Sequence, residues 1–130
     1  MFTITEHLLE NNVLKVLDLS ANKISFIGCK AIAKYLSGEN CVLESLILAN
    51  NRTGHFGAQA IAQAIPKNST LLHLDMTTND IDDEGLRFLG ESLKQNDTLV
   101  SMKLYYNHFD QSSLKVFHEL MQDKSRGSDN

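Results

Sequence analysis

The side chains that most often carry chemistry in proteins are present in this chain, but their spacing does not bring them together. The histidines show no ligand spacing such as His-Glu-x-x-His, and Cys29 and Cys41 do not form a Cys-x-x-Cys pair. The acidic run at residues 80–84 lacks the ligand spacing and final glutamate of a calcium loop. His73 and Asp75 are two residues apart, but no Ser or Cys nucleophile accompanies them. We therefore predict a non-enzyme with no catalytic residue, no cofactor and no metal.

A repeated motif, Leu-x-x-Leu-x-Leu-x-x-Asn, dominates the sequence instead. Its four copies begin at Leu14, Leu43, Leu71 and Leu99, with spacings of 29, 28 and 28 residues, and Met replaces Leu at single positions of the last two. A fixed period of this length indicates structural units that bury their apolar faces only by stacking on their neighbours. The sequence thus predicts a solenoid of four repeats.

Each repeat combines a strand pattern with a helix pattern. The last two leucines of the motif alternate as in a strand, with both pointing into the core. Residues 28–36, 57–65 and 85–93 carry apolar residues at three- and four-residue spacing, which is typical of an amphipathic helix. Because each strand reaches the next through a helix, the sheet is predicted to be parallel and the fold α/β.

Asparagines recur at fixed offsets within the repeat. One closes each strand, and an amide there can both donate to and accept from backbone groups left open where strand becomes loop. This structural ladder is predicted to comprise Asn22, Asn51, Asn79 and Asn107. Asn68 and Asn96 open glycosylation sequons before successive strands, and the repeat explains them better than secretion does. Asp82 or Asp83 is expected to cap the helix that follows it.

Composition limits the kinds of partner that the chain is expected to bind. The chain has 130 residues, of which 12 are basic and 16 acidic, which argues for one domain and against nucleic acid. No apolar run approaches the roughly 18 residues that span a bilayer, so no membrane is expected. Cys29 occupies a position filled by Ala58, Leu86 and Leu114 in other repeats, which favours a buried apolar role. Free thiols without a secretory signal indicate an intracellular setting.

From about Ile4 to Met121 the pattern resembles the ribonuclease-inhibitor-like class of leucine-rich repeats. The departures are Thr53, where the first and third repeats have Ile24 and Ile81, and Ser113, where the other repeats have glycine. The resemblance implies a curved solenoid with parallel strands on its concave face and helices on its convex face. Members are mostly cytoplasmic protein binders. A non-catalytic scaffold for a protein partner is thus implied.

The resemblance also leaves finer functions open. One expectation is a subunit of a cytoskeletal or ciliary assembly. The alternative is a regulator of a small GTPase, because one branch of similar repeats activates Ran. That branch has a longer array and an acidic tail, and both are missing from this sequence.

Two surfaces are candidates for binding a partner. On the concave face, outward strand positions form columns, and exposed aromatics with polar tips are favoured interface anchors. Its candidate residues are Asp18, Ile47, His73, Asp75, Lys103, Tyr105 and Tyr106. The tyrosines could instead cover the last repeat, and Lys103 could simply pair with Asp75. Phe26 and Phe56 mark a second surface, although we expect them to tuck under their loops rather than form an exposed patch.

The ends of the array differ from its middle. Residues 2–12 look like the helix of a repeat that lacks its strand, which leaves the strand at Leu14 as an open edge. Protein binding or edge-to-edge self-association could use this edge. The half repeat could be a cap or the mark of a fragment or short isoform of a longer array, and we favour the latter. Residues 1–121 are expected to form the repeat domain, and residues 122–130 a disordered polar tail.

Overall fold

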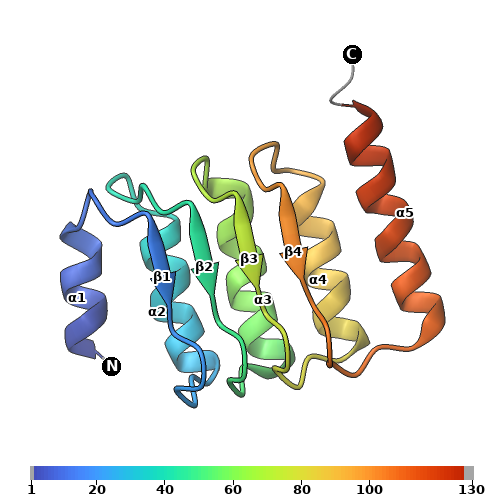
Figure 1. Cartoon of the computed structure of the whole chain (residues 1–130), viewed down its shortest axis with the longest axis horizontal. Helices are drawn as coiled ribbons and strands as arrows, with labels where there is room; N and C mark the ends of the chain where they lie inside the picture. The colour runs from blue at the N-terminus through green and yellow to red at the C-terminus, as the bar shows by residue number, and fades with distance from the viewer. Residues whose placement is uncertain (1, 128–130) are drawn as a thin grey trace.

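Strand–helix units follow one another along the chain after an N-terminal helix (Figure 1). The computed structural model describes residues 2–127. Its elements are α1 (Phe2–Glu10), β1 (Val16–Asp18), α2 (Phe26–Leu36), β2 (Ser45–Ile47), α3 (Gly54–Ala64), the 3-10 helix η1 (Ile65–Lys67), β3 (His73–Asp75), α4 (Asp83–Leu93), β4 (Ser101–Lys103) and α5 (Gln111–Gly127).

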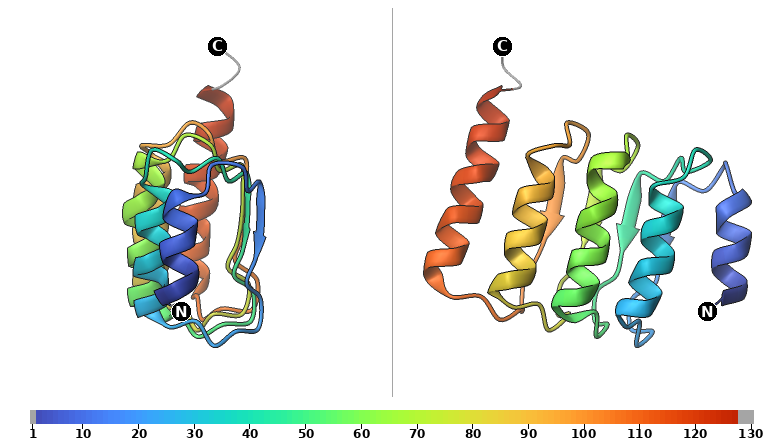
Figure 2. Two further views of the ribbon diagram at one scale, coloured as in Figure 1. Left: turned by 90° about the vertical axis from the view of Figure 1, so that its left-hand side faces the viewer. Right: turned by 180° about the vertical axis from the view of Figure 1, so that it is seen from behind.

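The strands form one parallel sheet in the order β1-β2-β3-β4, as the repeat predicts. The register follows the period, because Leu46 pairs with Leu17 on one side and with Leu74 on the other. Figure 2 shows the strands and the helices as two separate layers. We call the surface of the sheet that points away from the helices the strand face.

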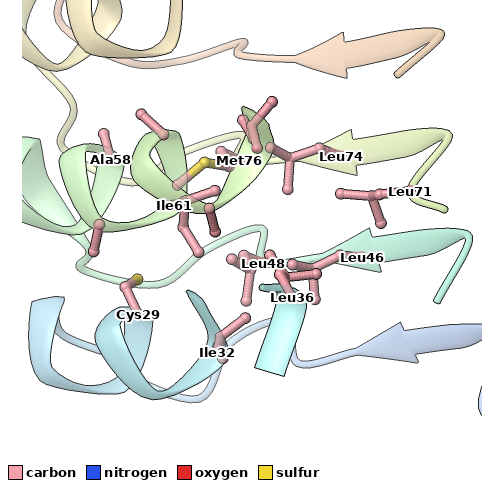
Figure 3. Close-up of a cluster of buried hydrophobic side chains, with 14 of the residues drawn as sticks. Cys29, Ile32, Leu36, Leu46, Leu48, Ala58, Ile61, Leu71, Leu74 and Met76 are labelled. Atoms are coloured by element: carbon pink, nitrogen blue, oxygen red, sulfur yellow. The ribbon is translucent and has the colours of Figure 1, made fainter. Parts of the chain in front are cut away.

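The core lies between these layers and extends from Leu8 in α1 to Leu99 before β4. Figure 3 shows its middle part, where side chains of α2 and α3 lie against those of β2 and β3. Leu46, Leu48, Leu74 and Met76 are fully buried, as their alternation predicts. The equivalent side chains of the first and last strands are only half-buried, because each of those strands has a neighbour on one side alone. Burial in the core is therefore supplied by the next repeat, and each unit depends on its neighbours.

The predicted asparagine ladder joins these repeats, except that the side chain of Asn22 bonds only within its own loop, to the oxygen of Ser20. Asn51 Oδ1 accepts hydrogen bonds from the backbone N–H groups of Asn22 and Ile24, both at 2.9 Å. Its Nδ2 donates to the carbonyl oxygens of Leu48 at 2.8 Å and Leu19 at 3.0 Å. One buried amide thus satisfies backbone groups of two consecutive repeats.

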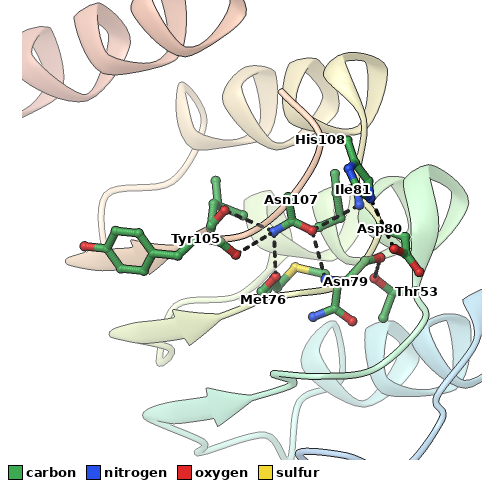
Figure 4. Close-up of polar contacts among 9 residues, drawn as sticks. Thr53, Met76, Asn79, Asp80, Ile81, Tyr105, Asn107 and His108 are labelled. Carbon is green, nitrogen blue, oxygen red and sulfur yellow. Dashed lines mark hydrogen bonds and ion pairs between the residues drawn. The ribbon is translucent and has the colours of Figure 1, made fainter. Parts of the chain in front are cut away.

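Asn107 makes the same hydrogen bonds as Asn51 through both its Oδ1 and its Nδ2, whereas Asn79 makes them through its Nδ2 alone. Asn107 Oδ1 accepts from the N–H groups of Asn79 at 2.9 Å and Ile81 at 3.0 Å (Figure 4). Asn79 Oδ1 is buried and finds no hydrogen-bond partner in the described part of the chain. The loop before α3 differs here, since Gly54 has a φ of +63° and donates its N–H to the backbone oxygen of Asn79 at 2.9 Å. Thr53, the departure from isoleucine, belongs to this same loop.

A second asparagine ladder stands at the opposite ends of the strands. Asn68 Oδ1 accepts from the N–H of Leu71 at 2.8 Å, and its Nδ2 donates to the oxygen of Leu36 at 2.9 Å. Asn96 Nδ2 donates to the oxygen of Ile65 at 2.7 Å in the same way. The sequence shows these two residues as sequons, whereas the structure shows buried amides that already have partners. The residues at this offset in the four repeats are Asn11, Asn40, Asn68 and Asn96.

The helix boundaries confirm some expectations and correct others. Asp82 is the cap of α4, because its Oδ1 accepts from the N–H of Gly85 at 3.0 Å. α1 ends at Glu10, within the predicted residues 2–12, and β1 lies at the N-terminal edge of the sheet. α5 continues to Gly127, past the expected end of the repeat domain at Met121. The rest of the predicted tail, residues 128–130, lies outside the described residues.

Replacing one amide of the first ladder tests its contribution. We predict that Asn51→Ala lowers the free energy of unfolding by about 3 kcal/mol, because several buried backbone groups lose their partners together. Urea unfolding followed by circular dichroism measures this change. Asn22→Ala is the matched control: its side chain is exposed and donates only to the oxygen of Ser20, so the cost is below about 0.5 kcal/mol. Equal costs for the two variants would contradict the assigned role.

The buried thiol of Cys29 gives a second prediction. Burial raises the pKa of this thiol to about 12, so the reactive thiolate is scarce near neutral pH. We expect Cys29 to resist iodoacetamide in the native protein at about pH 8 and to react readily in urea. Peptide mapping by mass spectrometry separates its labelling from that of Cys41. Rapid native labelling of Cys29 would show that the core opens at this repeat.

Candidate functional site

The strand face carries the predicted columns of outward side chains. The sheet register places Val16, Ser45, His73 and Ser101 in one column and Asp18, Ile47, Asp75 and Lys103 in the next. These side chains are exposed or half-buried, so a partner could reach both columns. The sequence therefore predicts this arrangement correctly.

The two aspartates of these columns accept hydrogen bonds from residues that follow them closely in the chain. Asp18 Oδ1 accepts from the hydroxyl of Ser20 at 2.6 Å and from its N–H at 2.9 Å, and these bonds lower the pKa of Asp18. Asp75 Oδ1 accepts from the N–H of Thr77 at 2.9 Å. Lys103 is paired with Asp75 in the backbone register, but no contact within 4.0 Å joins their charged groups. The alternative that Lys103 simply pairs with Asp75 is therefore wrong.

The two tyrosines beyond β4 stand out from the strand face into solvent. Tyr105 is 67% exposed and Tyr106 is 84% exposed, so neither covers the last repeat. Tyr106 has a φ of +56°, in the left-handed region that the equivalent Ala21, Asn50 and Thr78 also adopt. Asn107 Nδ2 donates to the backbone oxygen of Tyr105 at 3.3 Å (Figure 4). The asparagine ladder thus fixes the backbone that presents these rings.

A second exposed surface lies at the first turns of α2 and α3, and we call Phe26, Ile27, His55 and Phe56 the aromatic rim. Phe26 is 39% exposed, Ile27 57% and Phe56 59%, so the expectation that they tuck under their loops is wrong. Gly28 and Cys29, which follow Phe26 and Ile27, are the residues of this turn that enter the core. The rim side chains consequently point away from it.

The sequence reasoning missed two histidine–carboxylate pairs between neighbouring loops. His55 Nδ1 lies 3.3 Å from Asp82 Oδ2, and His108 Nε2 lies 3.2 Å from Asp80 Oδ1. The signal was available, because the partners are separated by about one repeat. Across the described residues, no group of three or more His, Cys, Asp or Glu side chains is arranged to hold a metal ion. Nor does any helix within residues 2–127 have the length and apolar character to cross a membrane.

A groove between α4 and α5 is also absent from the sequence predictions. Its volume is about 560 Å³, and Leu86, Gly90, Val116, Phe117 and Leu120 form its apolar lining. The lack of a side chain at Gly90 keeps part of the groove open, because a Cβ there would lie 3.4 Å from Leu120 and 3.5 Å from Phe117. The sequence does not show how far the last helix diverges from α4, so it could not reveal the groove.

Comparison with known proteins settles what the repeats are. A family model described as Leucine Rich repeat matches residues 10–33 and 67–90, which contain the first and third copies of the motif.

The chain carries leucine-rich repeats.

Relatives among characterised proteins share its repeats over short stretches. NACHT, LRR and PYD domains-containing protein 4C of Mus musculus is 35% identical over 80 residues, which cover 62% of this chain and 8% of the relative. NACHT, LRR and PYD domains-containing protein 5 of Homo sapiens is 33% identical over 73 residues, covering 56% of this chain and 6% of that protein. This leucine-rich-repeat chain therefore spans less than a tenth of these relatives.

A solved structure extends the similarity to nearly the whole chain. The structure named Leiomodin-1 Actin-Binding Site 2 (ABS2) superimposes with a TM-score of 0.79 and 25% identity, covering 95% of this chain and 71% of that one. Leucine-rich repeats are typically non-catalytic scaffolds for protein interaction. The ribonuclease-inhibitor-like subclass of these leucine-rich repeats stays a prediction.

Proposed function

We propose that this chain is a non-catalytic protein-interaction module whose strand face binds a protein partner at its C-terminal end. The observation that carries the proposal is the exposure of Tyr105 and Tyr106 beside β4. Large aromatic rings with polar tips supply much contact area for little lost conformational freedom, so they dominate many interfaces.

The neighbouring side chains suit a mixed apolar and polar contact. Lys103 is exposed and has no ion-pair partner in the described part of the chain, so it can pair with a carboxylate of the partner. His73 Nδ1 and Ser101 Oγ are hydrogen-bonded at 2.8 Å, and these two side chains form a polar border. Ile47 and Asp75 extend the same surface along the second column toward the N-terminal strand, where Asp18 ends it.

Actin is the partner we propose for this face. The support is the similarity to a leiomodin structure whose name describes an actin-binding site, with a match over nearly the whole chain. A cytoplasmic location in a cytoskeletal assembly follows from the same proposal. The solenoid supplies a rigid frame for the contact, which reduces the ordering that binding requires.

Affinity capture from cell lysate tests both parts of the proposal. We expect wild type to retain actin and Tyr105→Ala/Tyr106→Ala to lose it, with affinity at least about tenfold lower. Val100→Ala is the matched control, because Val100 is an exposed apolar residue at the other end of β4 and is expected to retain the partner. Circular dichroism first confirms that all three proteins are folded.

The outcomes separate the two parts. Wild type could capture other proteins but no actin, and the tyrosine variant could lose those proteins. This outcome would contradict the choice of actin. A captured set that the tyrosine variant retains in full would contradict binding at this face and would move the contact to another surface, such as the β1 edge.

A further inference from the structure

The aromatic rim is unusual because it is confined to the first two complete repeats. At the positions of Phe26 and Ile27 the third repeat has Asp83 and Glu84, and the fourth has Gln111 and Ser112. The core does not account for these apolar side chains, because the rim is largely exposed. An apolar cluster with polar surroundings on a small soluble domain commonly marks an interaction site.

The rim side chains form one continuous surface across α2 and α3. The ring centroids of Phe26 and Phe56 are 6.0 Å apart with an interplanar angle of 55°. The centroids of His55 and Phe56 are 4.2 Å apart. Two consecutive repeats therefore contribute adjacent rings at a distance at which one apolar side chain can contact both.

Cationic side chains occur on α2 and on the loops that lead into α2 and α3. Lys30 Nζ lies 5.3 Å from the centroid of the Phe26 ring. Lys23 and Arg52 are exposed in the loops that lead into α2 and α3, and the N–H of Arg52 donates to the oxygen of Ile24 at 3.2 Å, so the two loops are in contact. None of these three cations has a carboxylate within 4.0 Å among the described residues.

The two helices add to the same positive field. The first turns of α2 and α3 contain no acidic residue, and neither N-cap, Ser25 or Thr53, makes a side-chain capping bond. A helix N-terminus left in this state favours negative charge. α4 shows the opposite pattern, with Asp82 as cap and Asp83 in its first turn. The acid nearest to the rim, Asp82, is already paired with His55.

We infer that the aromatic rim is a docking site for a partner segment that presents a large apolar side chain flanked by carboxylates. The apolar side chain would lie on Phe26 and Phe56, and the carboxylates would pair with Lys30 and with Lys23 or Arg52. Asp83 and Glu84, which stand at the rim positions of the third repeat, would repel an acidic segment that extended over that repeat, which limits the site to the first two. The inference rests on the proposed function, since it names a second partner contact of the same interaction module.

Selection from a phage-displayed library of random peptides about a dozen residues long tests this inference. We expect wild type to select peptides in which Asp or Glu flanks Phe, Trp or Leu. Synthetic copies of these peptides should bind Phe26→Ala/Phe56→Ala at least about tenfold more weakly, as measured by fluorescence anisotropy. Lys30→Glu should weaken the same peptides while leaving both rings in place. Circular dichroism on each variant confirms folding.

Tyr105→Ala/Tyr106→Ala is the matched control, because it removes exposed rings from the other surface and should leave this binding unchanged. Selected peptides that lack acidic residues, or that bind the rim variant as well as wild type, would overturn the inference. Failure to select any peptide would overturn it too. Sedimentation that shows a dimer lost in the rim variant would identify a second copy as the occupant instead. Loss of peptide binding in the tyrosine variant alone would retain the strand-face proposal and reject the rim.

Discussion

The fold depends on buried asparagines that satisfy the backbone where strand becomes loop. No single repeat can close its own core, so the polar groups at each junction are buried against the next repeat. An amide both donates and accepts, and Asn51 or Asn107 can therefore bond two repeats simultaneously. The second ladder, at Asn68 and Asn96, does the same at the other ends of the strands. Apolar stacking supplies the driving force, and the two ladders fix its register.

This division leaves the outer positions of each repeat available for function. The residues that follow the strands are held by the ladder whatever their side chain, so Ala21, Asn50, Thr78 and Tyr106 share one left-handed backbone conformation. In the last repeat that position presents a tyrosine to solvent. The first turns of the helices are equally free to vary, and there the first two repeats present Phe26 and Phe56. Binding surfaces can thus differ between repeats while the core stays periodic.

Periodicity allowed most of the fold to be predicted from the sequence, and only part of the candidate sites. The strands, the register and the role of Asn51 follow from spacing, because a repeated core position has one physical explanation. Exposure of Phe26 and Phe56 does not follow, since the pattern cannot tell which way a side chain points before the first buried turn. The alternative of an ion pair between Lys103 and Asp75 was left open for a similar reason: backbone register brings two residues together but does not fix where their side chains point. Asn68 was visible at its repeat offset, and the repeat explained its sequon better than secretion did, but the offset alone did not show that its amide bonds the backbone of the preceding repeat.

Hydrogen exchange on the free chain tests most directly whether the asparagine ladder holds the repeats as one unit. The amides of Ile24 and Ile81, which donate to Asn51 and Asn107, should exchange only with the free energy of global unfolding. The amide of Thr53, in the loop where Asn79 Oδ1 has no partner within the described residues, should exchange faster and serves as an internal comparison. Fast exchange at Ile24 and Ile81 while the strands stay protected would contradict the account, because the loops would then open without disturbing the core.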